Sequence, residues 1–119
     1  MLEWIKKRDT YARWALQNGV WVYGTSSEPE YIRESEQFAL TVEHMRRIKA
    51  AALILEGEND FVFKGQAGKL ASELKSPHKH VVMRNADGAG EHCHMGAMRL
   101  LHQTIFDWLH ATLAPQHKK

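Results

Sequence analysis

The sequence predicts an α/β protein in which two parallel strands alternate with two helices. Residues 51–55 (AALIL) are continuously apolar and too short for a free-standing helix, which is typical of a strand buried on both faces of a sheet. Residues 79–83 (KHVVM) are a second strand candidate. A helical pattern follows each strand after a short connection, and this order predicts parallel pairing through a right-handed crossover.

Both helices of this β-α-β-α order are predicted from apolar side chains at helical spacing. Residues 65–75 have such a pattern, and Pro77 stops it. Residues 95–113 have the longest apolar stripe, which ends before Pro115. Residues 85–94, which precede this last helix, are predicted to form a loop rich in glycine, aspartate and histidine.

The first part of the chain is predicted to be mainly helical. We expect a helix over residues 1–18 with Gly19 as its stop, followed by a short extended run over residues 20–23. A capping-box pattern then predicts a helix over residues 28–38. A shorter helix is expected over residues 41–48.

Composition and charge limit the classes of protein to which this chain can belong. Its 119 residues, 44% of them apolar, suit one small globular protein that buries a core. The net charge of +2 is small, and the short basic clusters are mixed with acids, so we expect no nucleic-acid partner. Within that single chain we distinguish a helical segment, residues 1–48, from the β-α-β-α part, residues 49–119.

The expected location is the cytoplasm. Cys93 is the only cysteine, so no internal disulfide can form, which fits a reducing compartment. No apolar run approaches the roughly 20 residues that span a bilayer. The first ten residues, MLEWIKKRDT, do not resemble a signal peptide, and we expect no membrane partner.

Asp60 and His92 are the candidate catalytic residues. Each lies just beyond the end of a predicted strand, and sites in open α/β sheets form at the carboxyl ends of the strands. Either residue alone is explained more simply, as a turn aspartate or as a solvated loop histidine. Together they suit a pair in which the acid fixes the tautomer of the histidine, whose other nitrogen then acts as a general base.

The second part of the chain resembles the C-terminal end of an α/β-hydrolase. The resemblance rests on the segments LILEGEND, GQAGKL, GAGEHCH and IFDWL, which lie within residues 48–113. They are similar to those of a group that contains 2,6-dihydroxypseudooxynicotine hydrolase, the fermentation–respiration switch protein and the fungal polyketide-shortening hydrolases. Residues 1–48 more loosely resemble the helical lid that precedes the acid strand in these enzymes.

This resemblance implies the C-terminal portion of an α/β-hydrolase fold, with Asp60 as the acid and His92 as the base of a serine-type triad. The implied reaction is hydrolysis of an ester or a carbon–carbon bond in a small carbonyl substrate, and no cofactor or metal is implied. The half of the family's fold that bears its Gly-x-Ser-x-Gly nucleophile elbow has no counterpart in this sequence. We therefore expect self-association, or pairing with a missing N-terminal half.

Two other nucleophiles and a metal site are weaker alternatives. Ser26 precedes Asp60 and His92 in the order of this fold, but Glu28 occupies the position where the elbow needs a small residue. Cys93 could act as a nucleophile if a partner base lay at the right distance. Several neighbouring side chains could hold a metal ion, although their spacing is unusual for ligands. These side chains are Glu91, His92, Cys93 and His94, with His78, His80 and Asp87 nearby.

The competing class of function is a non-catalytic fragment or interaction module. Two strands are too few to stand alone, so an exposed sheet edge could pair with another chain. The apolar strand side chains that we expect to lack cover are Leu53, Ile54, Val81 and Val82.

Overall fold

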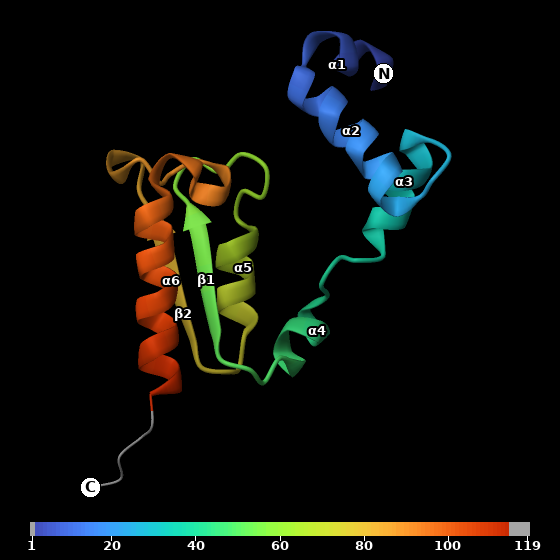
Figure 1. The fold of residues 1–119 in the computed structure, drawn as a ribbon. Helices are drawn as coiled ribbons and strands as arrows, with labels where there is room; N and C mark the ends of the chain where they lie inside the picture. Colours follow the sequence, from blue (N-terminus) through green and yellow to red (C-terminus); the bar gives the residue numbers. More distant parts are fainter. Residues whose placement is uncertain (1, 115–119) are drawn as a thin grey trace, which may run out of the picture. The chain divides into compact units, whose positions relative to one another are not determined.

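The computed structural model describes residues 2–114, so the predicted stop at Pro115 lies outside the described residues (Figure 1). The chain forms two compact units, Met1–Leu40 and Thr41–Lys119. The first unit is helical. The second contains the sheet, and its short first helix, α4 (Val42–Arg47), is capped by the side chain of Thr41.

Three helices make up the first unit: α1 (Leu2–Arg8), α2 (Thr10–Tyr23) and α3 (Glu28–Glu36). The prediction of one helix over residues 1–18 is wrong, because Asp9 starts a new helix by accepting the Ala12 N–H at 3.0 Å. The helix predicted over residues 28–38 is confirmed in place. Its N-cap is Ser27, whose hydroxyl accepts the Glu30 N–H.

The prediction that Gly19 is a helix stop and that residues 20–23 are extended is wrong. Gly19 is buried inside α2, where a Cβ atom would lie only 2.3 Å from the ring of Tyr31 on α3. The glycine thus permits close packing of the two helices. Tyr23 stays helical because its ring packs against Tyr31, with ring centroids 5.1 Å apart. The helix ends instead at Gly24, whose φ of 64° is left-handed.

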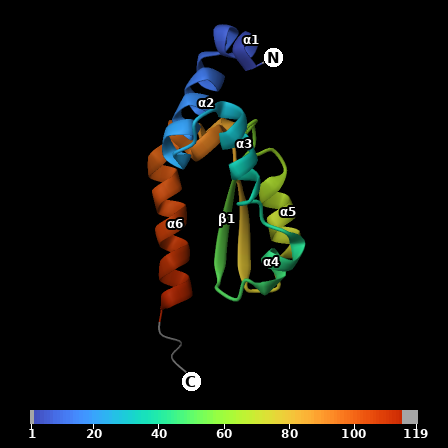
Figure 2. The same ribbon diagram turned by 90° about the vertical axis from the view of Figure 1, so that its right-hand side faces the viewer.

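The β-α-β-α order predicted for the second unit is confirmed. Strands β1 (Ala52–Gly57) and β2 (His78–Met83) pair in parallel, with Ala52 opposite His78 and Gly57 opposite Met83. Helix α5 (Gln66–Glu73) connects them. Two short 3₁₀ segments, η1 (Asn85–Asp87) and η2 (His92–Ala97), follow β2 and lead into α6 (Met98–Leu113). In both views α5 and α6 lie on opposite sides of the strand pair (Figure 1 and Figure 2).

Burial is uneven across this small sheet. Ile54 and Met83 are only 7% and 4% exposed, and the alternation of side chains along paired strands points them to opposite faces. The expectation that Ile54 lacks cover is therefore wrong. Val82 does lack cover, since it is 49% exposed. The second unit is thus an α/β arrangement with helices on both faces and an incompletely covered strand pair.

Helix α4 groups with the sheet in the second unit, and a lid role for residues 1–48 stays a prediction. Among residues 2–114, no helix combines the length and the apolar character needed to cross a bilayer.

Candidate active site

The loops that follow β1 and β2 are joined beyond the ends of the strands. Parallel strands bring their carboxyl ends to the same edge of a sheet, so both loops begin side by side. The Glu58 N–H donates to the Met83 carbonyl at 3.0 Å, and the Asn59 N–H donates to the Gly90 carbonyl at 2.8 Å. The Glu58 carboxylate also accepts the Asn85 N–H at 2.7 Å. The loop that carries Asp60 and the loop that carries His92 are therefore held together by hydrogen bonds.

Gly57 allows this close approach of the two loops, and Gly90 allows close packing within the second loop. A Cβ atom on Gly57 would lie 2.5 Å from the carbonyl oxygen of Gly90. A Cβ atom on Gly90 would lie 2.6 Å from the side-chain oxygen of Asn85. A larger residue at position 57 would force the two loops apart, and a larger residue at position 90 would collide with Asn85 within the second loop.

Asp60 is held by its own turn and faces His92. Its Oδ1 accepts the backbone N–H groups of Val62 and Phe63 at 2.8 and 3.3 Å. Its Oδ2 lies 3.0 Å from Nδ1 of His92. The structure thus brings together the two residues that the sequence singled out. Because both carboxylate oxygens are engaged, the carboxylate has little freedom to rotate.

The charge on Asp60 determines the proton position in this pair. An ionised carboxylate only accepts hydrogen bonds, so Nδ1 of His92 carries the proton and donates it to Asp60. In the neutral ring, Nε2 then bears a lone pair. The hydrogen bond from His92, helped by the N–H groups of Val62 and Phe63, lowers the pKa of Asp60 although partial burial opposes this. The arrangement can therefore orient an imidazole for general-base chemistry.

His92 lies on one wall of a pocket of about 230 Å³. Its ring stands 5.4 Å from the ring of Phe63. Its side chain is 32% exposed, against 17% for Asp60, so the base is more accessible than the acid. Other residues that line the pocket are Leu55, Ala67, Cys93 and His94. A small substrate group could reach His92 from this side.

The alternative metal ligands are turned toward separate partners. Nδ1 of His94 bonds the Ala89 carbonyl, and Nδ1 of His78 bonds the Ser76 carbonyl. Nε2 of His80 pairs with Glu56 at 2.8 Å. Within residues 2–114, no three side chains of His, Cys, Asp or Glu converge as a metal site would require.

Cys93 and Ser26 have different surroundings. Cys93 is exposed and lines the same pocket as His92, whose Nδ1 already faces Asp60. Ser26 follows helix α2, whereas a nucleophile elbow joins a strand to a helix. Its hydroxyl donates to Glu30 at 2.6 Å and lowers the pKa of that carboxyl. Ser26 therefore stabilises the first turn of α3 through its hydrogen bond to Glu30.

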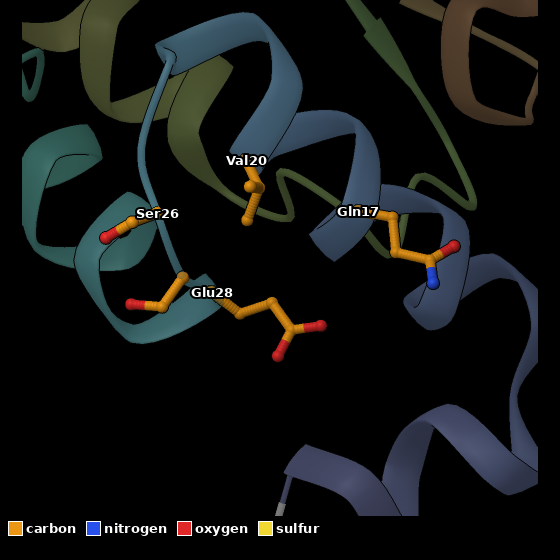
Figure 3. Close-up of a pocket in the computed structure, with 5 residues that line it drawn as sticks. Gln17, Val20, Ser26 and Glu28 are labelled. Atoms are coloured by element: carbon orange, nitrogen blue, oxygen red, sulfur yellow. The ribbon is translucent and has the colours of Figure 1, made fainter.

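A hollow of about 370 Å³ lies beside Ser26 in the first unit (Figure 3). Gln17 and Val20 border it from α2, and Glu28 borders it from the start of α3. Glu28 is bonded to Lys6 from α1. The charge of the Glu28 carboxylate at this hollow is thus balanced by Lys6 of the same unit.

Sequence reasoning missed the residues that support the pair. Glu58, Asn85 and Gly90 join the two loops, and His94 anchors the second loop. One signal was present, since the run Gly88-Ala89-Gly90 places two glycines shortly before the histidine, with Glu91 between them. Nothing in the spacing indicated which carbonyl His94 would bond.

Two curated proteins are similar to this chain. Hydrolase LUC6 of a Fusarium species is 28% identical over 105 residues, which cover 83% of this chain and 25% of that protein. The 20-hydroxy-prefusarin hydrolase FUS2 of Gibberella moniliformis is 26% identical over 107 residues, which cover 85% of this chain and 26% of that protein. The chain therefore spans about a quarter of the length of the curated relatives that it matches.

Both relatives are named as hydrolases and come from fungi, so the predicted resemblance to a group with fungal hydrolases is confirmed. No protein-family model matches the chain. No solved structure matches it either.

Proposed function

We propose that this chain supplies the acid and the base of a serine-type α/β-hydrolase, with Asp60 and His92 in those roles. The observation that carries the proposal is the 3.0 Å contact between Oδ2 of Asp60 and Nδ1 of His92, made by loops that follow neighbouring parallel strands. Acid and histidine occupy these positions in the α/β-hydrolase fold that the sequence resembles. The hydrolase names of the two relatives support the same reaction class.

In the proposed reaction, Nε2 of His92 takes the proton from a serine hydroxyl that attacks a carbonyl carbon. Asp60 accepts the hydrogen bond from Nδ1 and stabilises the imidazolium that forms. His92 then gives the proton to the leaving group, and a water molecule repeats the cycle on the acyl-enzyme. The serine oxygen bonds to the carbonyl carbon as the bond to the leaving group breaks, and water later cleaves the resulting acyl bond. No oxidation state changes in either half of the cycle, so the scheme needs no cofactor.

The nucleophile belongs, in this proposal, to a part of the protein outside these 119 residues. Ser26 is engaged with Glu30, and the relatives are about four times as long as the segment that they share with this chain. The substrate is a small carbonyl compound that contains an ester or a carbon–carbon bond to be cleaved. Residues 1–48 serve as the lid, and the protein works in the cytoplasm.

The partner surface is the strand pair itself. Two strands leave unpaired N–H and C=O groups at the sheet edges, and Val82 is 49% exposed. We propose that this sheet pairs with the nucleophile-bearing part of the protein or, without it, with a second copy of the chain. The same exposed sheet supports the second candidate function, a non-catalytic interaction module.

Hydrolysis of a p-nitrophenyl ester tests the catalytic proposal. The purified chain should show negligible turnover. A chimera in which this chain replaces the matching segment of the Fusarium hydrolase should be active. Asp60→Asn should reduce its kcat by about 10⁴-fold, and His92→Ala should reduce its kcat by about 10⁶-fold. Asp107→Asn, an exposed carboxylate on α6, is the matched control and should leave kcat/KM unchanged.

Two outcomes would contradict the proposal. Robust turnover by the isolated chain that disappears in both variants would restore Ser26 or Cys93 as the nucleophile. A folded, active chimera that is indifferent to Asp60→Asn and His92→Ala would remove these residues from the reaction and favour the interaction module.

A further inference from the structure

His94 is a buried titratable side chain to which the proposed reaction assigns no role. It is 7% exposed, and it lies two residues after His92 in a loop that is otherwise largely open to solvent. Its Nδ1 lies 2.8 Å from the carbonyl oxygen of Ala89. A carbonyl oxygen only accepts, so Nδ1 of His94 carries a proton and donates it.

This hydrogen bond closes the loop that carries His92. The carbonyl that accepts it belongs to Ala89, which is fully buried. The Ala89 N–H in turn donates to the Arg84 carbonyl at 3.0 Å, directly after β2. The His94 N–H donates to the Glu91 carbonyl at 2.9 Å. His92 thus lies in a short loop whose two ends are tied together and joined to the sheet.

The backbone beyond His92 has an unfavourable conformation. Cys93 and His94 have φ angles of 57° and 55°, which lie in the left-handed region. Two successive residues with side chains rarely adopt this region, so the surrounding contacts must hold them there. The bond between His94 and Ala89 is the side-chain contact placed to do so.

We propose that His94 is a positioning residue that holds the imidazole of His92 against Asp60. The proposal deepens the proposed function and rests on it. Without the hydrogen-bond donor at His94, the left-handed residues Cys93 and His94 can relax to ordinary backbone angles. This relaxation changes the orientation of His92, which precedes them. His92 would then lose its fixed direction toward Oδ2 of Asp60, although both catalytic side chains remain present.

Four substitutions separate this role from simple space filling. His94→Leu fills the space but removes the donor, and His94→Gly relieves the backbone strain but also removes the donor. His94→Asn keeps a side-chain N–H near the place of Nδ1, and asparagine tolerates the left-handed region. His94→Gln carries its N–H group one bond further out, near the place of Nε2, so it is the polar mismatch.

The readout is the protonation of the two ring nitrogens of His92, measured by ¹⁵N NMR on the full chain with labelled histidine. The His92 signals are assigned with His92→Ala, and Asp60→Asn supplies the reference spectrum for a broken pair. Thermal unfolding of each variant is recorded in parallel, because a purely structural residue would lower the melting temperature without changing the His92 ring in the folded state.

In the wild type and in His94→Asn, we expect the His92 proton on Nδ1. In His94→Leu and His94→Gly, we expect the His92 spectrum to move to that of Asp60→Asn. If the pair is present in the wild type and persists in both of these variants, the positioning role is wrong. If His94→Leu and His94→Gly do not fold, the comparison of His94→Asn with His94→Gln replaces them. Equal His92 spectra in these two variants would then show that the positioning role is wrong.

Failure of the proposed function gives a different result. In that case the chimera stays active after Asp60→Asn and His92→Ala, whether or not the His92 spectrum depends on His94. A wild-type His92 spectrum that already equals the spectrum of Asp60→Asn would instead show that no pair exists for His94 to position.

Discussion

Gly57 approaches Gly90 so closely that a methyl group on Gly57 would stand 2.5 Å from the Gly90 carbonyl oxygen. This contact sets the separation of the loops that carry Asp60 and His92. A backbone oxygen cannot swing away as the end of a flexible side chain can. Gly57→Ala should therefore lower the free energy of unfolding by about 1–3 kcal/mol, as overpacking commonly does. Chemical denaturation of the purified chain measures this change.

Gly68 provides the matched control for that substitution. It lies within α5, and a Cβ atom there would meet nothing within 4 Å. Gly68→Ala should raise the free energy of unfolding by roughly 0.5–1 kcal/mol, because alanine favours the helix. Equal effects of the two substitutions would mean that the close contact between Gly57 and Gly90 does not constrain the loops.

The pKa of Asp60 predicts how stability depends on pH. Its hydrogen bond from His92 lowers this pKa in the folded chain, so the charged carboxylate stabilises the fold above the ordinary aspartate pKa of about 3.9. This contribution is lost as the pH falls through the lower pKa of folded Asp60. The stability gap between the wild type and Asp60→Asn should therefore shrink as the pH falls below about 4.

Urea denaturation between neutral pH and pH 3 measures that gap. Asp107→Asn on α6 controls for the removal of an exposed carboxylate. A gap that stays the same down to pH 3 would show that the Asp60 charge does not interact with His92 in the folded chain.

The α/β order and the Asp60–His92 pair could be predicted because local signals and topology agreed. Strand β1 is a short apolar run and β2 ends in the apolar residues Val81, Val82 and Met83. Parallel pairing brings the carboxyl ends of both strands to one edge whatever the packing details. The contacts that support the pair are of another kind. The bond from His94 to Ala89 depends on two left-handed residues, Cys93 and His94, neither of which is a glycine. Sequence patterns assign that conformation to glycine or asparagine, so they gave no sign of it.

In the first unit, local sequence preferences led to a wrong prediction. Residues 20–23 are β-branched and aromatic, which favours an extended run, and Gly19 resembles a helix stop. Tertiary packing overrides both preferences, because Tyr31 occupies the space over Gly19 and stacks edge-on with Tyr23. A single sequence contains no direct sign of that contact between α2 and α3.

The contact between Gly19 and Tyr31 leads to the third prediction. A Cβ atom on Gly19 would lie 2.3 Å from the Tyr31 ring, so Gly19→Ala should destabilise the packing of α2 on α3 by about 1–3 kcal/mol. Near-ultraviolet circular dichroism and thermal unfolding report this change. In a Tyr31→Leu background, which removes the obstructing ring, Gly19→Ala should cost less than it does in the wild type. An equal cost of Gly19→Ala in both backgrounds would show that the ring is not the obstacle.

The exposed valine on β2 leads to the last prediction, which concerns self-association. Val82 is 49% exposed on a two-stranded sheet whose edges are open to pairing. Burying an apolar side chain of this size against a second copy of the chain favours association. Val82→Glu should weaken association about tenfold, which corresponds to about 1.4 kcal/mol. Sedimentation velocity over a range of concentrations measures this.

Val22 on α2 is the control, since it is the same residue type and is 61% exposed. Val22→Glu should leave the association constant unchanged if the sheet is the contact surface. Weaker association in Val22→Glu but not in Val82→Glu would place the contact on the helical unit. A wild-type chain that stays monomeric at every concentration would remove the second copy as a partner and leave the nucleophile-bearing part of the protein as the proposed occupant of the sheet edge.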